Sequence, residues 1–258
     1  MRKNICMLLL SAAFASCTSE STETPEQPES LSVECYSRSA DNNTKSLVKD
    51  FAMYVFSGSG NYEGVSNPVH VTYSDKWDFP SITLREPAQI HAFYPYTDNM
   101  DYTAIPLSLT PQTDYLASVD AVTADKSNPS ISIVMEHILS KVNVTINSSS
   151  NCKVTLTDIP STASYNLRSN NLLTKAESDV TSSTSSVLMF PTAEERQIGM
   201  KISYEGKTYS YRANPKVYES GKSYTYTLKI NDDKELAIIG DVIITDWKAG
   251  GNYEGTVQ

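Results

Sequence analysis

Apolar and polar residues alternate with period two in short runs that begin near residue 31 and continue almost to the end of the chain. The runs are rich in Val, Ile, Thr and Tyr, and clusters of Ser, Asn, Asp, Gly and Pro separate them. Alternation between turn-forming clusters is typical of strands that bury one face. We expect strands over residues 69–73, 82–84, 90–96, 142–146, 224–230 and 242–244. The pattern predicts an all-β chain with few or no helices.

One pair of runs also predicts how the chain turns. Residues 199–204 and 208–212 both alternate, and the short segment Glu205–Lys207 between them contains a glycine. Two alternating runs around a short glycine-containing turn indicate a β-hairpin. We therefore expect these residues to form two antiparallel neighbours.

Three other segments require a choice between structures. Residues 51–56 have Val and Phe at positions that suit a strand, so we expect a strand there rather than a helix. The Ser- and Thr-rich segment 178–186 is interpreted as a surface loop. The apolar run 187–191 that follows it is interpreted as a buried strand.

The N-terminus predicts export and a lipid anchor. Arg2 and Lys3 precede an apolar stretch that is too short to span a bilayer, as in a signal peptide. The small residues before Cys17 resemble a bacterial lipobox, so residues 1–17 are interpreted as a lipoprotein signal with Cys17 as the acylated residue. An ordinary cleavage site beside an incidental cysteine is the alternative. Residues 18–30 lack large apolar groups and predict a flexible tether.

Chain length favours two folding units. About 240 residues remain after the signal, enough for one or two domains. We expect two β-sandwich domains over residues 31–136 and 137–258, because short strands at this spacing suit a sandwich. The boundary is placed near Glu136, where the apolar run 131–135 passes into the run that contains Val142.

Charge and cysteine content exclude some partners. The net charge is −9 and the basic residues are scattered, so the chain lacks the basic patch of a nucleic-acid-binding protein.

Of the four cysteines, Cys6 leaves with the signal and Cys17 would carry lipid, so Cys35 and Cys152 remain. Each lies in an alternating run, which favours two separate buried thiols, although a disulfide between them is the open alternative.

Candidate catalytic chemistry is scarce in the sequence. His70, His91 and His137 are scattered along expected strands, outside any metal-binding spacing. The chain lacks the motifs of nucleophilic elbows, phosphate loops and calcium loops. We expect no enzyme activity, metal or cofactor. The 16 tyrosines are compatible with a sugar-stacking face, but cross-strand packing is the preferred interpretation.

Six strings of residues together resemble the fimbrillin family, the Mfa-like and major-fimbrillin lipoproteins that build type V pili. They occur in the order and rough spacing of that family across the mature chain. The strings are Val48–Tyr54, Ile90–Tyr96, Asp114–Ala117, Met135–Val142, Tyr218–Tyr226 and Thr245–Trp247. The resemblance implies two transthyretin-like β-sandwich domains in tandem, and a lipoprotein exposed on the cell outer membrane as part of a fimbrium with a role in cell adhesion.

The resemblance also implies an assembly mechanism. In that family a protease cuts after an arginine that follows the first strand, and a strand of another subunit replaces the strand that is lost. Here Arg38 and Ser39 would flank the cut. The displaced strand would carry Leu31, Val33 and Cys35 on its inner face.

The donor strand would come from the C-terminal part of the chain. It would carry Val242, Ile244 and Trp247, or would lie in the tail 252–258. Other fimbrial subunits are the implied partners, and the chain would be a stalk or a tip subunit. The alternative is a monomeric surface lipoprotein that binds a glycan or a host protein, in which Arg38 is an ordinary loop residue.

Overall fold

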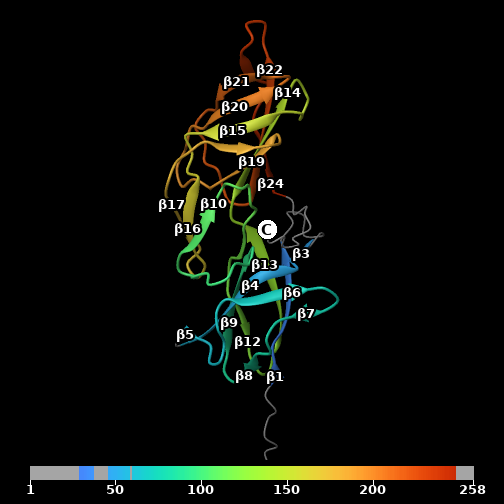
Figure 1. Cartoon of the computed structure of the whole chain (residues 1–258), viewed down its shortest axis with the longest axis vertical. Helices are drawn as coiled ribbons and strands as arrows, with labels where there is room; N and C mark the ends of the chain where they lie inside the picture. Colours follow the sequence, from blue (N-terminus) through green and yellow to red (C-terminus); the bar gives the residue numbers. More distant parts are fainter. Residues whose placement is uncertain (1–28, 38–45, 59, 248–258) are drawn as a thin grey trace, which may run out of the picture.

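The computed structural model describes residues 29–37, 46–58 and 60–247, and these residues form strands, bridges and turns without a helix. The predicted all-β class is confirmed. The molecule is elongated, with the N-terminal strands toward one end and the strands after residue 140 toward the other (Figure 1).

The N-terminal part is built on a ten-stranded sheet. Its order is β3 (Ser46–Leu47), β2 (Ser32–Ser37), β13 (Ser130–His137), β11 (Leu116–Ser118), β9 (Ala88–Tyr94), β4 (Asp50–Ser57), β6 (Val69–Tyr73) and β7 (Trp77–Asp78). β12 (Val122–Ala124) pairs with β9, and β5 (Gly60–Asn61) pairs with β4. A separate pair joins β1 (Glu29–Ser30) to β8 (Thr83–Leu84). The strands predicted at 69–73 and 51–56 are therefore present.

This sheet is buried on both faces at its centre. Seven of the eight residues of β4 are buried, which alternation on a single face would not produce. Phe51, Met53 and Val55 join a core that also contains Val33 of β2. The intervening residues Ala52, Tyr54 and Phe56 join a second core, which continues into the C-terminal half. β4 therefore separates two apolar cores.

The C-terminal part is a sandwich of two sheets. The first has the order β19 (Ser186–Met189), β14 (Ser140–Ile146), β22 (Lys222–Ile230) and β23 (Leu236–Ile238), and β24 (Ile243–Asp246) also pairs with β22. The second has the order β18 (Val180–Ser182), β15 (Lys153–Thr157), β20 (Gly199–Tyr204) and β21 (Lys207–Arg212). Val144 and Tyr226 from the first sheet and Val154 and Ile202 from the second share one buried core.

The predicted hairpin and the predicted loop had different outcomes. β20 and β21 pair in antiparallel register, and both turn residues, Glu205 and Gly206, have positive φ angles of 49° and 73°. This backbone suits the twist of a hairpin, so the prediction is confirmed.

The interpretation of residues 178–186 as a loop was wrong in part, because β18 pairs with β15 there. Val180 and Ser182 are buried although most of their neighbours are small and polar.

A third sheet connects the two halves of the chain. β10 (Ile105–Ser108) pairs with β16 (Thr162–Asn166), which pairs with β17 (Asn171–Thr174). β10 lies before residue 136 and β16 after it, so both pairing and core cross the expected domain boundary. The division into two transthyretin-like domains at residue 136 stays a prediction.

The two described cysteines are free and buried. Cys35 belongs to the N-terminal core and Cys152 to the larger core, which matches the expectation of two separate thiols. Burial raises the pKa of the Cys35 thiol and also raises the pKa of the Cys152 thiol. Both groups therefore stay protonated and poorly reactive at neutral pH.

Candidate functional site

The first long strand, β2, combines a buried face with an exposed face. Val33 and Cys35 are fully buried, Leu31 is 5% exposed, and Ser32 and Glu34 face solvent. This is the alternation of a strand that covers a core on one side. Leu31, Val33 and Cys35 thus point inward, as the sequence predicts, while their role in a displaced strand remains a prediction.

β2 pairs with β13 in parallel over its whole length, from Ser32 opposite Ser130 to Ser37 opposite Met135. Val33 therefore lies beside Ile131, and Cys35 beside Ile133, on the buried face of the sheet. On its other edge, β3 pairs with Tyr36 and Ser37, and the backbone N–H of Val48 donates to the carbonyl of Cys35, so the uncovered stretch of this edge is Ser32–Glu34. The strand is thus held by β13 and by its own buried side chains, and the segment just before it is held by the β1–β8 pair and by the N–H of Leu31, which donates to the carbonyl of Ile82.

The loosely covered edge of β2 borders a cleft of about 540 Å³. Leu31–Glu34 line one wall, and Tyr73, Trp77 and Phe79 from the β6–β7 region line the other. Strands from opposite ends of the ten-stranded sheet thus meet here, which means that the sheet curls around its core. In the part of the chain described, β2 is the strand at this open seam.

Several predicted site residues lie outside the described residues. These are Cys17, Arg38, Ser39 and the tail 252–258. The residues that border the segment containing Arg38 are described: Ser37 and Ser46 are paired at the ends of β2 and β3. The predicted cut, after Arg38, would therefore fall one residue beyond the last paired residue of β2.

The C-terminal strand β24 is an edge strand with little burial. It pairs with β22 from Thr225 opposite Ile243 to Lys222 opposite Asp246, while β14 occupies the other edge of β22. All four residues of β24 are exposed, and Ile243 and Ile244 are 58% and 48% accessible. Of the predicted donor residues, Ile244 is therefore exposed. Val242 and Trp247 are half-buried and pack against the large core.

Trp247 connects the end of this strand to the middle of the molecule. Its ring stacks on that of His137, with centroids 4.1 Å apart and an angle of 6° between the planes. The ammonium of Lys141 lies 5.3 Å from the centroid of the indole ring. The backbone N–H of Trp247 donates to the carbonyl of Gly221 at 2.7 Å. Gly221 has a φ of +67°, a conformation that favours glycine.

His137 is itself fixed by a carboxylate. Its Nδ1 lies 3.0 Å from Oδ1 of Asp114, and its side chain is 3% exposed. Its Nε2 is buried without a hydrogen-bond partner in the structure. Sequence reasoning placed Asp114, His137 and Trp247 in family-like strings but did not bring them together, because no local pattern pairs residues on three distant segments. The expectation that all three histidines lie on strands is confirmed: His70 is in β6, His91 in β9 and His137 in β13.

The comparison with known families decides the relationship. The family model described as fimbrillin-like matches residues 39–247. The chain belongs to the fimbrillin-like family. No protein with a curated description matches the sequence.

Solved structures agree with the fold of this fimbrillin-like chain. A candidate cell adhesion protein of Bacteroides uniformis is 16% identical with a TM-score of 0.66, and the match covers 85% of this chain and 99% of that one. A second, from Bacteroides ovatus, is 15% identical with a TM-score of 0.67, covering 87% and 100%. A fimbrial protein of Bacteroides vulgatus is 10% identical with a TM-score of 0.50, covering 85% and 99%. At such low identity, these matches show that the fold is shared.

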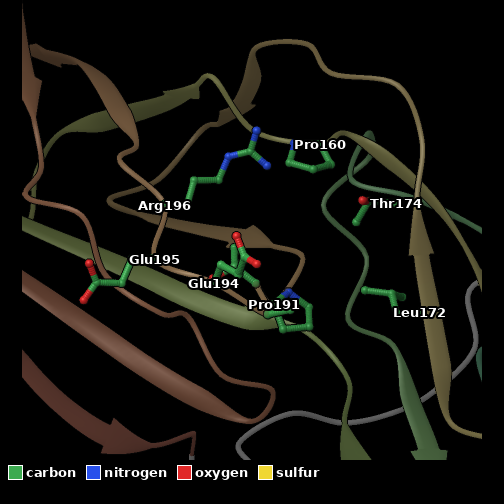
Figure 2. Close-up of a pocket in the computed structure, with 9 residues that line it drawn as sticks. Pro160, Leu172, Thr174, Pro191, Glu194, Glu195 and Arg196 are labelled. Carbon is green, nitrogen blue, oxygen red and sulfur yellow. The ribbon is translucent and has the colours of Figure 1, made fainter.

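The fimbrillin-like chain also has a cleft of about 520 Å³ beside β17, lined by other residues than the cleft at β2. Leu172 and Thr174 lie on one side of it, and Glu194 and Arg196 on the other (Figure 2). Arg196 forms an ion pair with Glu177, so its charge is already balanced. The residues that line this cleft therefore do not point to a particular ligand or reaction.

The described residues contain no cluster of three or more His, Cys, Asp or Glu side chains that would hold a metal ion. They also contain no helix with the length and hydrophobicity needed to cross a membrane.

Proposed function

We propose that this chain is a structural subunit of a pilus, a stalk or a tip subunit with a role in cell adhesion, and that it assembles by exchange of its first strand. Membership of the fimbrillin-like family supports the pilus role. The solved structures with a similar fold, which are named as fimbrial and cell adhesion proteins, agree with it. The chain is proposed to act by assembly, without catalysis, metal or cofactor.

The single observation that carries the mechanism is the setting of β2. Leu31, Val33 and Cys35 fill the core from the first long strand, and the stretch Ser32–Glu34 of that strand has an open edge at the cleft. Cleavage after Arg38 would leave β2 bound without a covalent link. Its loss would bare six residues of β13 and an apolar floor around Ile131 and Ile133. Unpaired strand edges and apolar floors are what an added strand recognises.

The match to the fimbrillin-like family covers residues 39–247, so the segment matched lies entirely on the C-terminal side of the proposed cut. Ser39 would become the first residue of the mature subunit. Acylated Cys17 would hold the precursor at the outer membrane until this step.

The proposed donor is the C-terminal strand of another subunit. β24 is exposed and loosely packed, which suits a segment that leaves its own sheet. In a regular strand Val242 and Ile244 share one face, and Trp247 lies on the opposite face. Val242 and Ile244 would then replace two of the buried side chains of β2, and Trp247 would contact the outside of the acceptor.

Strand exchange can be tested with purified precursor. Limited digestion with trypsin should cut after Arg38 and produce a ladder of multimers that resists mild detergent. Arg38→Ala should remove the ladder, whereas Arg85→Ala, on an exposed residue of the same half, should leave it unchanged. A ladder that persists in Arg38→Ala, or a protein cut after Arg38 that stays monomeric, would refute the mechanism. The second result would favour the monomeric surface lipoprotein that binds a glycan or host protein.

A further inference from the structure

The C-terminal strand has few contacts of its own to hold it in place. None of the four side chains of β24 is buried, and it is an edge strand. Asp246 forms an ion pair with Lys222, but exposed pairs contribute little. Backbone pairing to β22 alone is weak in a short exposed strand. Residues just outside β24 must therefore determine whether it stays attached.

Trp247, the residue directly after β24, has the contacts that the strand lacks. Its indole ring is stacked on His137 and approached by Lys141. Aromatic stacking and cation–π contacts each add to the stabilisation from burial alone. Its N–H also donates to the carbonyl of Gly221, the residue before β22. Three separate contacts thus converge on one residue at the end of the strand.

The ring on which Trp247 stacks is held by contacts of its own. The His137 ring is buried, paired with Asp114 on one side and covered by Trp247 on a face. The backbone of His137 is paired with Leu116 of β11. The stack therefore attaches the end of β24, which has few contacts of its own, to the paired strands β11 and β13.

The position of His137 also relates the stack to the first strand. His137 is the last residue of β13, and Met135, two positions earlier, is the last residue of β13 that pairs with β2. β24 runs toward the middle of the molecule, where β13 ends (Figure 1). One end of β13 therefore contacts both the strand proposed to leave and the strand proposed to be donated.

We propose that the stack of Trp247 on His137 is a latch that keeps the C-terminal strand on its own subunit and limits the rate at which it is released. Asp114 acts as a positioning residue, because it fixes the ring on which the indole stacks. The consequence for assembly rests on the proposed strand exchange, but the latch itself is a property of the uncleaved monomer.

The test is hydrogen–deuterium exchange of the uncleaved chain, read on peptides that cover residues 240–247. Trp247→Ala should increase exchange there about ten- to thirtyfold, because it removes both the stack and the cation–π contact. Trp247→Phe, which keeps a ring, should restore most of the protection. Ile243→Ala is the matched control: it shortens an exposed side chain of the same strand and should change exchange less than about twofold.

A second variant separates the latch from the donor sequence. His137→Leu leaves residues 240–247 intact and should still increase their exchange, with peptides from β15 and β20 unchanged. After cleavage at Arg38 it should form multimers faster than the parent. Unchanged exchange of residues 240–247 in both Trp247→Ala and His137→Leu would overturn the latch even if multimers form. If the parent forms no multimers, the proposed function fails while the exchange result still decides the latch.

Discussion

Val33→Ala should loosen the first strand without altering its exposed face. The substitution removes two methyl groups from a side chain that is fully buried in the N-terminal core. At about 0.8 kcal/mol for each buried methylene-sized group, the loss of burial is about 1.6 kcal/mol. The cavity left beside Ile131 raises the cost to about 2 kcal/mol.

Before cleavage, that cost lowers the free energy of unfolding of the whole chain. After cleavage, β2 is a noncovalent ligand of the groove, and about 2 kcal/mol corresponds to about thirtyfold weaker binding. Most of the change should fall on the dissociation rate. The assay uses a chain labelled with a fluorophore at its N-terminus and cut at a single engineered protease site within residues 38–45. Release of the labelled peptide is followed by fluorescence anisotropy.

Ser32→Ala is the matched control, because Ser32 lies on the same strand but faces solvent. Its release rate should stay within about twofold of the parent. Equal release rates for Val33→Ala and Ser32→Ala would contradict the reasoning, since they would mean that the buried face of β2 does not hold the strand.

Three further outcomes follow from the sequence and structure. Cys17→Ala should leave the protein unprocessed or release it from membranes, as cell fractionation and intact mass would show; an unchanged mature mass would argue against lipidation. Burial and the charge of Arg168 lower the pKa of His91 below its usual 6.5, so the unfolded chain binds more protons and the free energy of unfolding should decline as pH falls below about 6.5. His91→Gln should flatten this part of the pH dependence measured by urea denaturation, and an unchanged dependence would refute the argument. The buried hydroxyls of Tyr218 and Tyr226 are 2.7 Å apart. Tyr226→Phe should therefore lower the free energy of unfolding, measured by chemical denaturation, by about 1–3 kcal/mol, because it leaves the Tyr218 hydroxyl without its partner. A change near zero would mean that another hydrogen bond replaces this one.

Local patterns predicted the elements that depend on local contacts. The hairpin at 199–212 and the strand at 69–73 were predictable because alternation and turn residues are adjacent in sequence. β18 was missed because its buried positions include Ser182, a residue that sequence patterns assign to the surface. Its burial depends on β15, which is distant in sequence.

Long-range pairing limited the prediction of the site. The inward face of β2 followed from the alternation of Leu31, Val33 and Cys35, but its parallel pairing with β13 had no local signal. The pairing of β10 also had no local signal, because its partner β16 lies beyond the expected domain boundary. The stack of Trp247 on His137 required two strands to end at the same place, which only the assembled sheets reveal.

Removal of the first strand is the central claim of this account, and the mature N-terminus of the surface-exposed protein tests it most directly. Mass spectrometry of the protein sheared from the surface of producing bacteria should identify Ser39 as its first residue, with acylated Cys17 and residues 18–38 missing. A mature chain that begins at acylated Cys17 and retains β2 would contradict the account.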